Sequence, residues 1–197
     1  MKKKEPKDLL IIPDCHAAPE YDNKRFSALG NFIVEQQPEI IVCLGDLADM
    51  PSLSSYDKGT KGFEGRRYKK DVLSVIDAQE KLFEPIKRLN NNKRKRKEKQ
   101  YKPKLYMCLG NHEDRIDRAI NSAPELEGAI GIKDLQYEKF GWKITQFKSC
   151  LSIENIIFSH YFTSGVAGRP ISSTHIGFHL VSKLHCSAVQ GHSHLYN

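Results

Sequence analysis

The segment that most constrains the fold is residues 40–49, which read IIVCLGDLAD. Its first five residues are apolar and start with three β-branched side chains, which is typical of a strand buried inside a parallel sheet. Gly45 ends this strand, because a glycine lets the backbone turn and lets a second group approach closely. Asp46 and Asp49 therefore follow the carboxyl end of a strand, the position where open α/β sheets bind their ligands.

Four further apolar runs are followed by side chains of the kind that bind metals or phosphate. These runs are predicted strands at residues 8–13, 104–109, 150–159 and 186–190. The polar side chains that follow them are Asp14, His16, Asn111, His112, His160, His192 and His194. One such residue after one strand is usually part of a plain turn, but five strand ends of this kind predict a single shared site.

Helical periodicity separates the strands and predicts an α/β fold, with parallel strands joined by right-handed crossovers. Residues 23–37 and 68–89 carry apolar side chains at helical spacing, and Pro85 is expected to kink or split the second of these helices. A third helix is predicted to start near Glu113. A fourth helix is predicted to begin at Ser172 or Ser173, with the inward side chains Ile176, Leu180, Val181 and Leu184.

The remaining segments complete the expected domain. Residues 142–147 and 150–159 are predicted to form an antiparallel hairpin that turns near Lys148 and Ser149. Residues 50–67 are polar and rich in glycine, and they either cover the predicted site or form a solvated connection. We expect a single domain over residues 1–197, with an insertion of loop, helix and basic residues at about 51–103.

The positive charge of the chain is concentrated in one segment. The formal net charge is +7, yet residues 87–104 contain ten lysine and arginine residues against the single Glu98, so the remainder is mildly acidic. The alternative to a functional role is a solvated loop, because Tyr101 is the only aromatic residue of this segment that could stack on bases. The functional interpretation is a nucleic-acid contact through Lys93, Arg94, Lys95, Arg96 and Lys97.

The five cysteines are scattered, and no two of them have the spacing of a zinc site. We therefore expect a reduced, cytoplasmic protein without a disulfide framework. No apolar run approaches the length of a membrane span, and the lysine-rich start leads into a strand that is too short for a signal peptide. The sequence leaves the oligomeric state open.

The donors that follow the strands are carboxylates, one amide and imidazoles. Oxygen and nitrogen donors without thiolate favour Mn²⁺, with Fe, Zn²⁺ or Ni²⁺ as alternatives. Two such ions ~3.5–4 Å apart can clamp both oxygens of an in-line displacement at phosphorus, with a bridging hydroxide as the nucleophile. Asp46 is the natural bridging ligand. The full donor set is too large for one tetrahedral ion and suits two: Asp14, His16, Asp46, Asn111, His160, His192 and His194.

His112 directly follows one of these donors. A histidine titrates near pH ~6.5, so His112 can act as the general acid that protonates the leaving oxygen. Asp49 can hold the tautomer of this ring and raise its basicity. The predicted catalytic pair is therefore His112 with Asp49.

The motifs Asp14-x-His16, Gly45-Asp46-x-x-Asp49, Gly110-Asn111-His112-Glu113, His160 and Gly191-His192-x-His194 together resemble the signature of the calcineurin-like metallophosphoesterases. The compact size resembles the small members of bacteriophages and bacteria. The resemblance implies a two-sheet β-sandwich flanked by helices, and it implies His112 as the catalytic acid with Asp49 as its partner. It also implies one metal on Asp14, His16, Asp46 and His194, and a second on Asp46, Asn111, His160 and His192.

Two features depart from the family pattern. The protein phosphatases of the family continue the Asp46 motif with Arg-Gly, whereas Met50 and Pro51 stand here. In those phosphatases the arginine binds the substrate phosphate, so its absence here argues against a protein phosphatase. The chain also stops three residues after His194, so we expect the second sheet to be trimmed at its C-terminal edge.

Three functions agree with these observations. The first is a metal-dependent phosphodiesterase or nuclease, with DNA or RNA as substrate. The second is a phosphomonoesterase that acts on nucleotides or phosphoproteins. The third is a nucleic-acid-binding module with a degenerate metal site. In either enzyme, Arg169 in the loop after the hairpin could contact a substrate phosphate.

Overall fold

The computed structural model describes residues 7–165 and 168–194. Four parallel strands form the first sheet in the order β1 (Leu9–Ile12), β2 (Ile40–Cys43), β3 (Lys104–Cys108) and β4 (Lys143–Thr145). The second sheet has the order β5 (Leu151–Ile153), β6 (Ile156–Ser159) and β9 (Ser187–Gln190), with β5 antiparallel and β9 parallel to β6. A short antiparallel pair is formed by β7 (Thr163–Ser164) and β8 (Arg169–Pro170).

The α-helices of the described ranges are α1 (Lys24–Gln36), α2 (Tyr68–Lys95), α3 (Asp114–Ser122) and α4 (Ile176–Leu184). Single turns of 3₁₀ helix lie in the connections, at η1 (Pro51–Leu53), η2 (Lys61–Phe63), η3 (Pro124–Leu126), η4 (Ile132–Leu135) and η5 (Tyr137–Phe140). Within those ranges, no helix is both long and apolar enough to cross a membrane.

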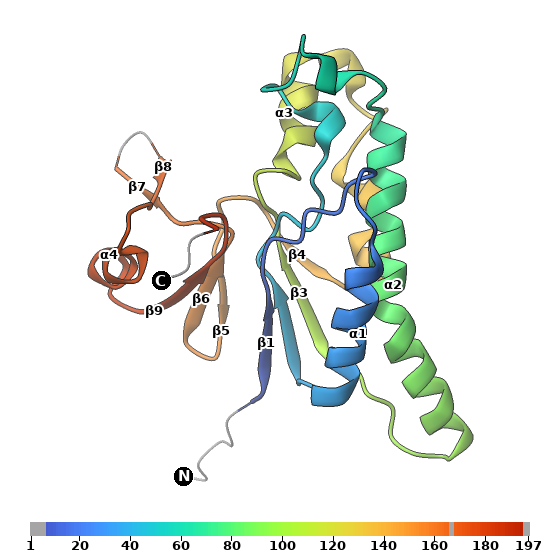
Figure 1. Ribbon diagram of the computed structural model, residues 1–197. Helices are drawn as coiled ribbons and strands as arrows, with labels where there is room; N and C mark the ends of the chain where they lie inside the picture. Colours follow the sequence, from blue (N-terminus) through green and yellow to red (C-terminus); the bar gives the residue numbers. More distant parts are fainter. Residues whose placement is uncertain (1–6, 166–167, 195–197) are drawn as a thin grey trace.

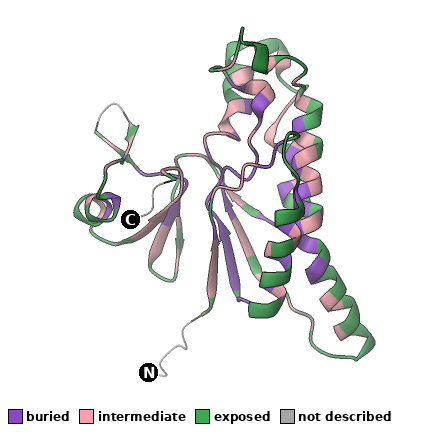
Figure 2. Ribbon diagram, in the orientation of Figure 1, coloured by how far each residue is buried: buried purple, intermediate pink, exposed green. Residues whose placement is uncertain are grey.

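The elements lie in layers, with α1 and α2 on one side of the parallel sheet and the second sheet on the other (Figure 1). The alternation of side chains along β2 explains this order. Ile41 and Cys43 belong to the hydrophobic cluster that includes the inner faces of α1 and α2. Ile40 and Val42 belong to a second cluster, which also contains Phe158 of β6. As a result every residue of β2 is buried (Figure 2).

The helix α4 packs on the far face of the second sheet. Ile176 and Leu180 are buried in a third cluster, against Ile157 of β6 and Ala188 of β9. Val181 was predicted to face inward as well, but it is exposed, so this prediction is wrong. Its neighbour Leu180 takes the inward position, because residues one apart on a helix point in different directions.

The mixed α/β fold class is confirmed, and so are most of the predicted strands. The predicted hairpin between residues 142–147 and 150–159 is wrong. β4 is parallel to β3 and belongs to the first sheet, so it does not pair with the strand that follows it. The hairpin is instead formed by β5 and β6, and its turn lies at Glu154 and Asn155, which both have left-handed backbone conformations.

The helix α2 is longer than the predicted 68–89. It includes Pro85 without a break and ends at Lys95, so a split at Pro85 is wrong, while a kink there stays a prediction. Its 28 residues correspond to about 42 Å. The helix begins beside η1, where the backbone N–H of Ser52 donates to Asp71. From there it runs along the sheet towards the amino ends of the strands (Figure 1).

The basic end of α2 therefore lies at the amino ends of the parallel strands. Here Tyr101 exchanges two hydrogen bonds of 2.8 Å with the side chain of Asn90, and the backbone N–H of Lys104 donates to Glu39 just before β2. A shallow pocket of about 840 Å³ at this edge is lined by Lys93, Lys99, Lys102 and Lys104, among others. We call residues 93–104 the basic pole.

Candidate metal centre

The carboxyl ends of the strands bring the predicted donors together. The ends of β1 and β2 are adjacent, and so are those of β6 and β9. Three groups of carboxylate and imidazole side chains lie at these ends, and the ligand atoms of each group are within 4.8 Å of one another. The groups are Asp14 with His16 and His194, His16 with Asp46 and His112, and Asp46 with His160 and His192.

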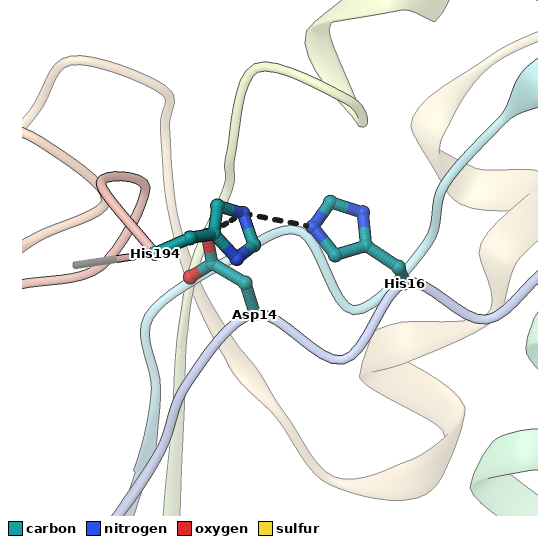
Figure 3. A group of neighbouring side chains, drawn as sticks. All are labelled: Asp14, His16 and His194. Carbon is teal, nitrogen blue, oxygen red and sulfur yellow. Dashed lines mark hydrogen bonds and ion pairs between the residues drawn. The ribbon is translucent and has the colours of Figure 1, made fainter. Parts of the chain in front are cut away.

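Asp14 has the least exposed side chain of the first group (Figure 3). Its side chain is 4% exposed, and its Oδ2 accepts a hydrogen bond of 2.8 Å from the backbone N–H of His192. Nε2 of His194 lies 3.5 Å from the same oxygen and 3.4 Å from Nε2 of His16. Three donors from opposite ends of the chain thus face one point, and the exposed His194 leaves it open to solvent.

Asp46 connects the other two groups. It is 1% exposed, its Oδ1 accepts a hydrogen bond of 2.9 Å from the backbone N–H of His112, and its Oδ2 lies 3.3 Å from Nε2 of His160. The same nitrogen of His160 is 2.8 Å from Oδ1 of Asn111. The ring centroid of His192 is 5.1 Å from that of His160. The predicted amide donor is therefore next to the predicted imidazoles.

The chemistry of these donors fits a divalent cation. Nδ1 of His160 donates to the carbonyl of Leu44 at 2.9 Å, and Nε2 of the same ring points at the oxygens of Asn111 and Asp46. This is the arrangement of a metal-binding histidine, because the bond at Nδ1 leaves Nε2 and the neighbouring oxygens free to bind one cation together. Oδ1 of Asp14 is also buried, and it has no hydrogen-bond partner in the described part of the chain.

The charges of the centre shift the pKa values of its members. Burial lowers the pKa of His160, but the hydrogen bond and the charge of Asp46 outweigh burial and raise it overall. The hydrogen bond to Asp49 raises the pKa of His16. Burial raises the pKa of Asp46, yet the contacts with His160 lower it by more. The lowered pKa of Asp46 keeps its carboxylate ionised, and an ionised carboxylate is a ligand for a divalent cation.

His112 is oriented by Asp49, as its predicted role requires. Its Nδ1 lies 2.5 Å from Oδ1 of Asp49, and its Nε2 faces the centre, 3.7 Å from Oδ2 of Asp46. Burial raises the pKa of Asp49, but the hydrogen bonds with His112 and His16 hold it far below its usual range. The sequence reasoning missed Arg115, which donates to the carbonyl of Asp49 at 2.7 Å and has Nη2 3.4 Å from Nε2 of His112.

Glu113 supports the centre from within the core, and the sequence reasoning missed this as well. Its Oε2 accepts hydrogen bonds from the backbone N–H groups of Asp46 and Gly110, each 2.9 Å long. Its Oε1 accepts from the backbone N–H of Ala48 and the hydroxyl of Tyr137, also at 2.9 Å. These bonds compensate the burial of the carboxylate and tie two turns together. The available signal was an acidic residue directly after two predicted site residues.

Left-handed backbone conformations are concentrated at the site. Non-glycine residues rarely adopt them, and functional sites are where they cluster. Close approaches also require glycine here: a Cβ on Gly110 would lie 2.0 Å from Oδ1 of Asp46, and one on Gly191 would lie 2.3 Å from Oδ1 of Asp14. The site residues with φ between 48° and 70° are His16, Asp46, Met50, His192 and His194.

The predicted substrate contacts lie outside the three groups of donors. Arg169 is exposed on β8, although the next residue, Pro170, lines a pocket beside Asn111. The predicted nucleic-acid contacts lie at the basic pole, at the amino ends of the parallel strands, whereas the donors lie at the carboxyl ends (Figure 1). These contacts are Lys93, Arg94 and Lys95 in the last turn of α2, followed by Arg96 and Lys97.

Comparison with known proteins gives the family. A sequence model of the calcineurin-like phosphoesterases matches residues 8–196, a range that includes every predicted donor. The chain is also similar to the Gene 54 protein of Mycobacterium phage L5, with 30% identity over 121 residues. The match covers 61% of this chain and 42% of the phage protein, so the chain spans less than half of that relative. The predicted resemblance is confirmed, and the chain belongs to the calcineurin-like phosphoesterases, a family of metal-dependent hydrolases of phosphoester bonds.

Proposed function

We propose that the chain is a phosphodiesterase that acts on nucleic acid with two divalent metal ions. The observation that carries the proposal is the convergence of carboxylate, amide and imidazole donors at the strand ends of both sheets. When bound, two such ions would polarise the phosphate and lower the pKa of the attacking water. Mn²⁺ is the metal we expect first, with Fe, Zn²⁺ or Ni²⁺ as alternatives.

Each donor has a proposed place. Asp46 would be shared by both ions, because its carboxylate lies within 4.8 Å of ligand atoms of His16 in one group and of His160 and His192 in another. One ion would be held by Asp14, His16, Asp46 and His194. The other would be held by Asp46, Asn111, His160 and His192.

His112 is the proposed general acid. Asp49 holds Nδ1, so a proton on Nε2 points toward the centre and can pass to the leaving oxygen. Arg115 lies against the same ring and would bind a nonbridging oxygen of the phosphate.

Arg115 also favours a second candidate function, a phosphomonoesterase. A phosphomonoester carries one more negative charge than a diester, so it gains more from an adjacent guanidinium. The basic pole favours the diester, because polyanions gain from cations that lie away from the reacting phosphate.

Three further features of the chain are proposals of the same kind. The two sheets and the apolar cluster that they share support the family's two-layer sandwich. Residues 1–197 would form one domain, with residues 51–103 as an insertion. The cysteines of the described ranges are free, which supports a reducing cytoplasm, and a phage origin would make it that of the host.

The test compares two substrates under Mn²⁺. Turnover of bis(p-nitrophenyl) phosphate is measured beside that of p-nitrophenyl phosphate, with purified protein loaded with metal. We expect the diester to be hydrolysed faster and the activity to be lost in Asp46→Asn. The matched control is Asp22→Asn, since Asp22 is an exposed aspartate whose Oδ1 accepts a hydrogen bond from the backbone N–H of Lys24, and an amide oxygen can accept the same bond.

The other outcomes separate the alternatives. Faster turnover of the monoester would support the phosphomonoesterase instead. Absence of turnover on both substrates, together with oligonucleotide binding that needs no metal, would identify a nucleic-acid-binding module with a degenerate site.

A further inference from the structure

A pocket of about 290 Å³ opens directly beside the candidate metal centre. Asn111 and His192, two of the proposed ligands, form part of its wall. Its other walls come from the segment after β2, from α3 and from the segments that follow β4 and β6. Three aromatic side chains line the pocket, those of Tyr56, Phe147 and Tyr161. Three cationic side chains line it as well, those of Arg115, Arg118 and Lys148.

The aromatic rings form an ordered wall that continues to the metal centre. The rings of Phe147 and Tyr161 are perpendicular at 87°, with centroids 5.3 Å apart. The ring of Tyr161 lies 4.8 Å from that of His192. Tyr161 is buried, whereas Tyr56, which also lines the pocket, is 87% exposed. A planar group in the pocket could therefore stack on a fixed ring and be covered by an exposed one.

The cations are placed around this wall. Arg118 donates to the carbonyl of Asn111 at 3.2 Å, so its guanidinium is held at the rim of the site. The ammonium of Lys148 lies 5.3 Å from the centre of the Phe147 ring. Arg115 lies deeper, against His112. Among the residues that line the pocket, the only carboxylate opposing these three cations is that of Asp114.

This combination identifies a substrate class. Aromatic faces together with cations are how proteins bind single-stranded nucleic acid, because bases stack on the rings while phosphates pair with the cations. The volume is at the lower end of the range for small-molecule pockets, which suits one nucleotide rather than a larger ligand. A base that is paired inside a duplex presents no free face to such a wall.

We propose that this pocket binds the nucleotide next to the scissile phosphate of a single-stranded nucleic acid. The inference rests on the proposed function, since it places that phosphate at the metal centre. The base of the adjacent nucleotide stacks against Phe147 under Tyr56, and its own phosphate meets Arg118 and Lys148.

The test uses two fluorescein-labelled oligonucleotides of equal length. One is oligothymidylate, and the other has the same sugar-phosphate backbone with abasic tetrahydrofuran residues throughout. With Mn²⁺, the wild-type protein should cleave the intact strand on the order of tenfold faster, because stacking on an aromatic side chain contributes that much per base. Tyr56→Ala and Phe147→Leu should each remove most of this preference, mainly by raising KM for the intact strand.

The matched control is Tyr21→Ala, since Tyr21 is also an exposed tyrosine but does not line the pocket. This variant should keep the preference of the wild-type protein. Lys148→Gln should slow cleavage of both strands alike, because the cation contacts phosphate and not the base.

Three results would overturn the inference. Equal cleavage of intact and abasic strands would mean that the pocket does not bind a base. Turnover of a phosphotyrosyl peptide in preference to the oligonucleotide would assign the aromatic wall to a protein substrate. If neither the strands nor bis(p-nitrophenyl) phosphate is hydrolysed, the proposed function fails. Fluorescence anisotropy of the two strands then tests the pocket by binding alone. Equal affinity for both strands would overturn the inference, and tighter binding of the intact strand that Tyr56→Ala removes would support it.

Discussion

The carboxylate of Glu113 accepts a hydrogen bond from the backbone N–H of Asp46, with 2.9 Å between Oε2 and nitrogen. The same carboxylate accepts bonds from Gly110, Ala48 and the hydroxyl of Tyr137. One buried side chain thus holds the turn after β2 against the turn after β3. The proposed bridging ligand is positioned by a group that lies in the core and does not reach the substrate.

Removing parts of this support should reduce stability in a set order. Tyr137→Phe leaves Oε1 with one donor and should lower the free energy of unfolding by about 1 kcal/mol. Glu113→Gln places an N–H₂ group against backbone N–H donors and should cost about 3 kcal/mol. Urea unfolding measures both. Tyr106→Phe is the control, since its hydroxyl makes no hydrogen bond within residues 7–165 and 168–194, and its effect should stay below about 0.5 kcal/mol. If Tyr137→Phe also lowers the free energy of unfolding by less than about 0.5 kcal/mol, the hydrogen bond from Tyr137 does not contribute to stability.

Replacement of His112 should affect poor leaving groups most. His112→Ala should lower kcat for a dinucleotide by about 10²–10⁴-fold, because the departing alkoxide needs a proton. The loss should be much smaller for bis(p-nitrophenyl) phosphate, whose leaving group departs as a stable anion. Steady-state kinetics on both substrates measures the difference. An equal loss on both would assign His112 to binding rather than to proton transfer.

Binding of Mn²⁺ should stabilise the folded protein. At a free metal concentration 100 times its Kd, one site contributes about 2.7 kcal/mol, which thermal unfolding detects as a higher Tm. Asp46→Asn should lose this gain. His179→Gln should keep it, because His179 is in none of the described groups that could hold an ion. Stabilisation that survives in Asp46→Asn would place the metal elsewhere.

The basic pole should contribute to binding of nucleic acid through charge alone. Replacing Lys93, Arg94 and Lys95 together by glutamine should reduce the slope of log K against log salt for single-stranded DNA by about 2, at ~0.7 per phosphate contact. Titration by fluorescence anisotropy at several salt concentrations gives this slope. The control removes three exposed lysines that lie apart from one another, Lys24, Lys133 and Lys183. If both variants have the same slope, the basic pole is only a solvated surface.

Asp71 at the start of α2 should make stability depend on pH. Its side chain is 1% exposed, Oδ2 accepts from the backbone N–H of Ser52, and burial raises its pKa. A carboxyl whose pKa is higher in the folded protein loses stability as pH rises from its unfolded value of about 3.9 through the folded value. Asp71→Asn carries no charge, so it should be more stable than wild type at pH 7, and the difference should shrink towards pH 4. A difference that is constant across this range would exclude the ionisation as its cause.

The strand ends of the site could be predicted because their signal is local. Residues 40–49 carry the whole pattern of strand, glycine and carboxylate in one segment. β4 was assigned to the wrong sheet because it has only three residues and pairs with a strand far away in the sequence. The pocket could not be predicted, since Tyr56 and Phe147 come from connections whose course depends on the packing of the whole chain.

The left-handed residues of the site also bear on how the stability of this protein is distributed. An L-residue in that conformation costs about 1 kcal/mol more than glycine does, and His16, Asp46, Met50, His192 and His194 all adopt it. Together this is a sizeable fraction of the 5–15 kcal/mol that typically separates folded from unfolded protein. The folded chain therefore carries a local conformational cost at the candidate metal centre, which packing and hydrogen bonds elsewhere must offset. At Met50 part of that offset is local, because its side chain is fully buried in the main core.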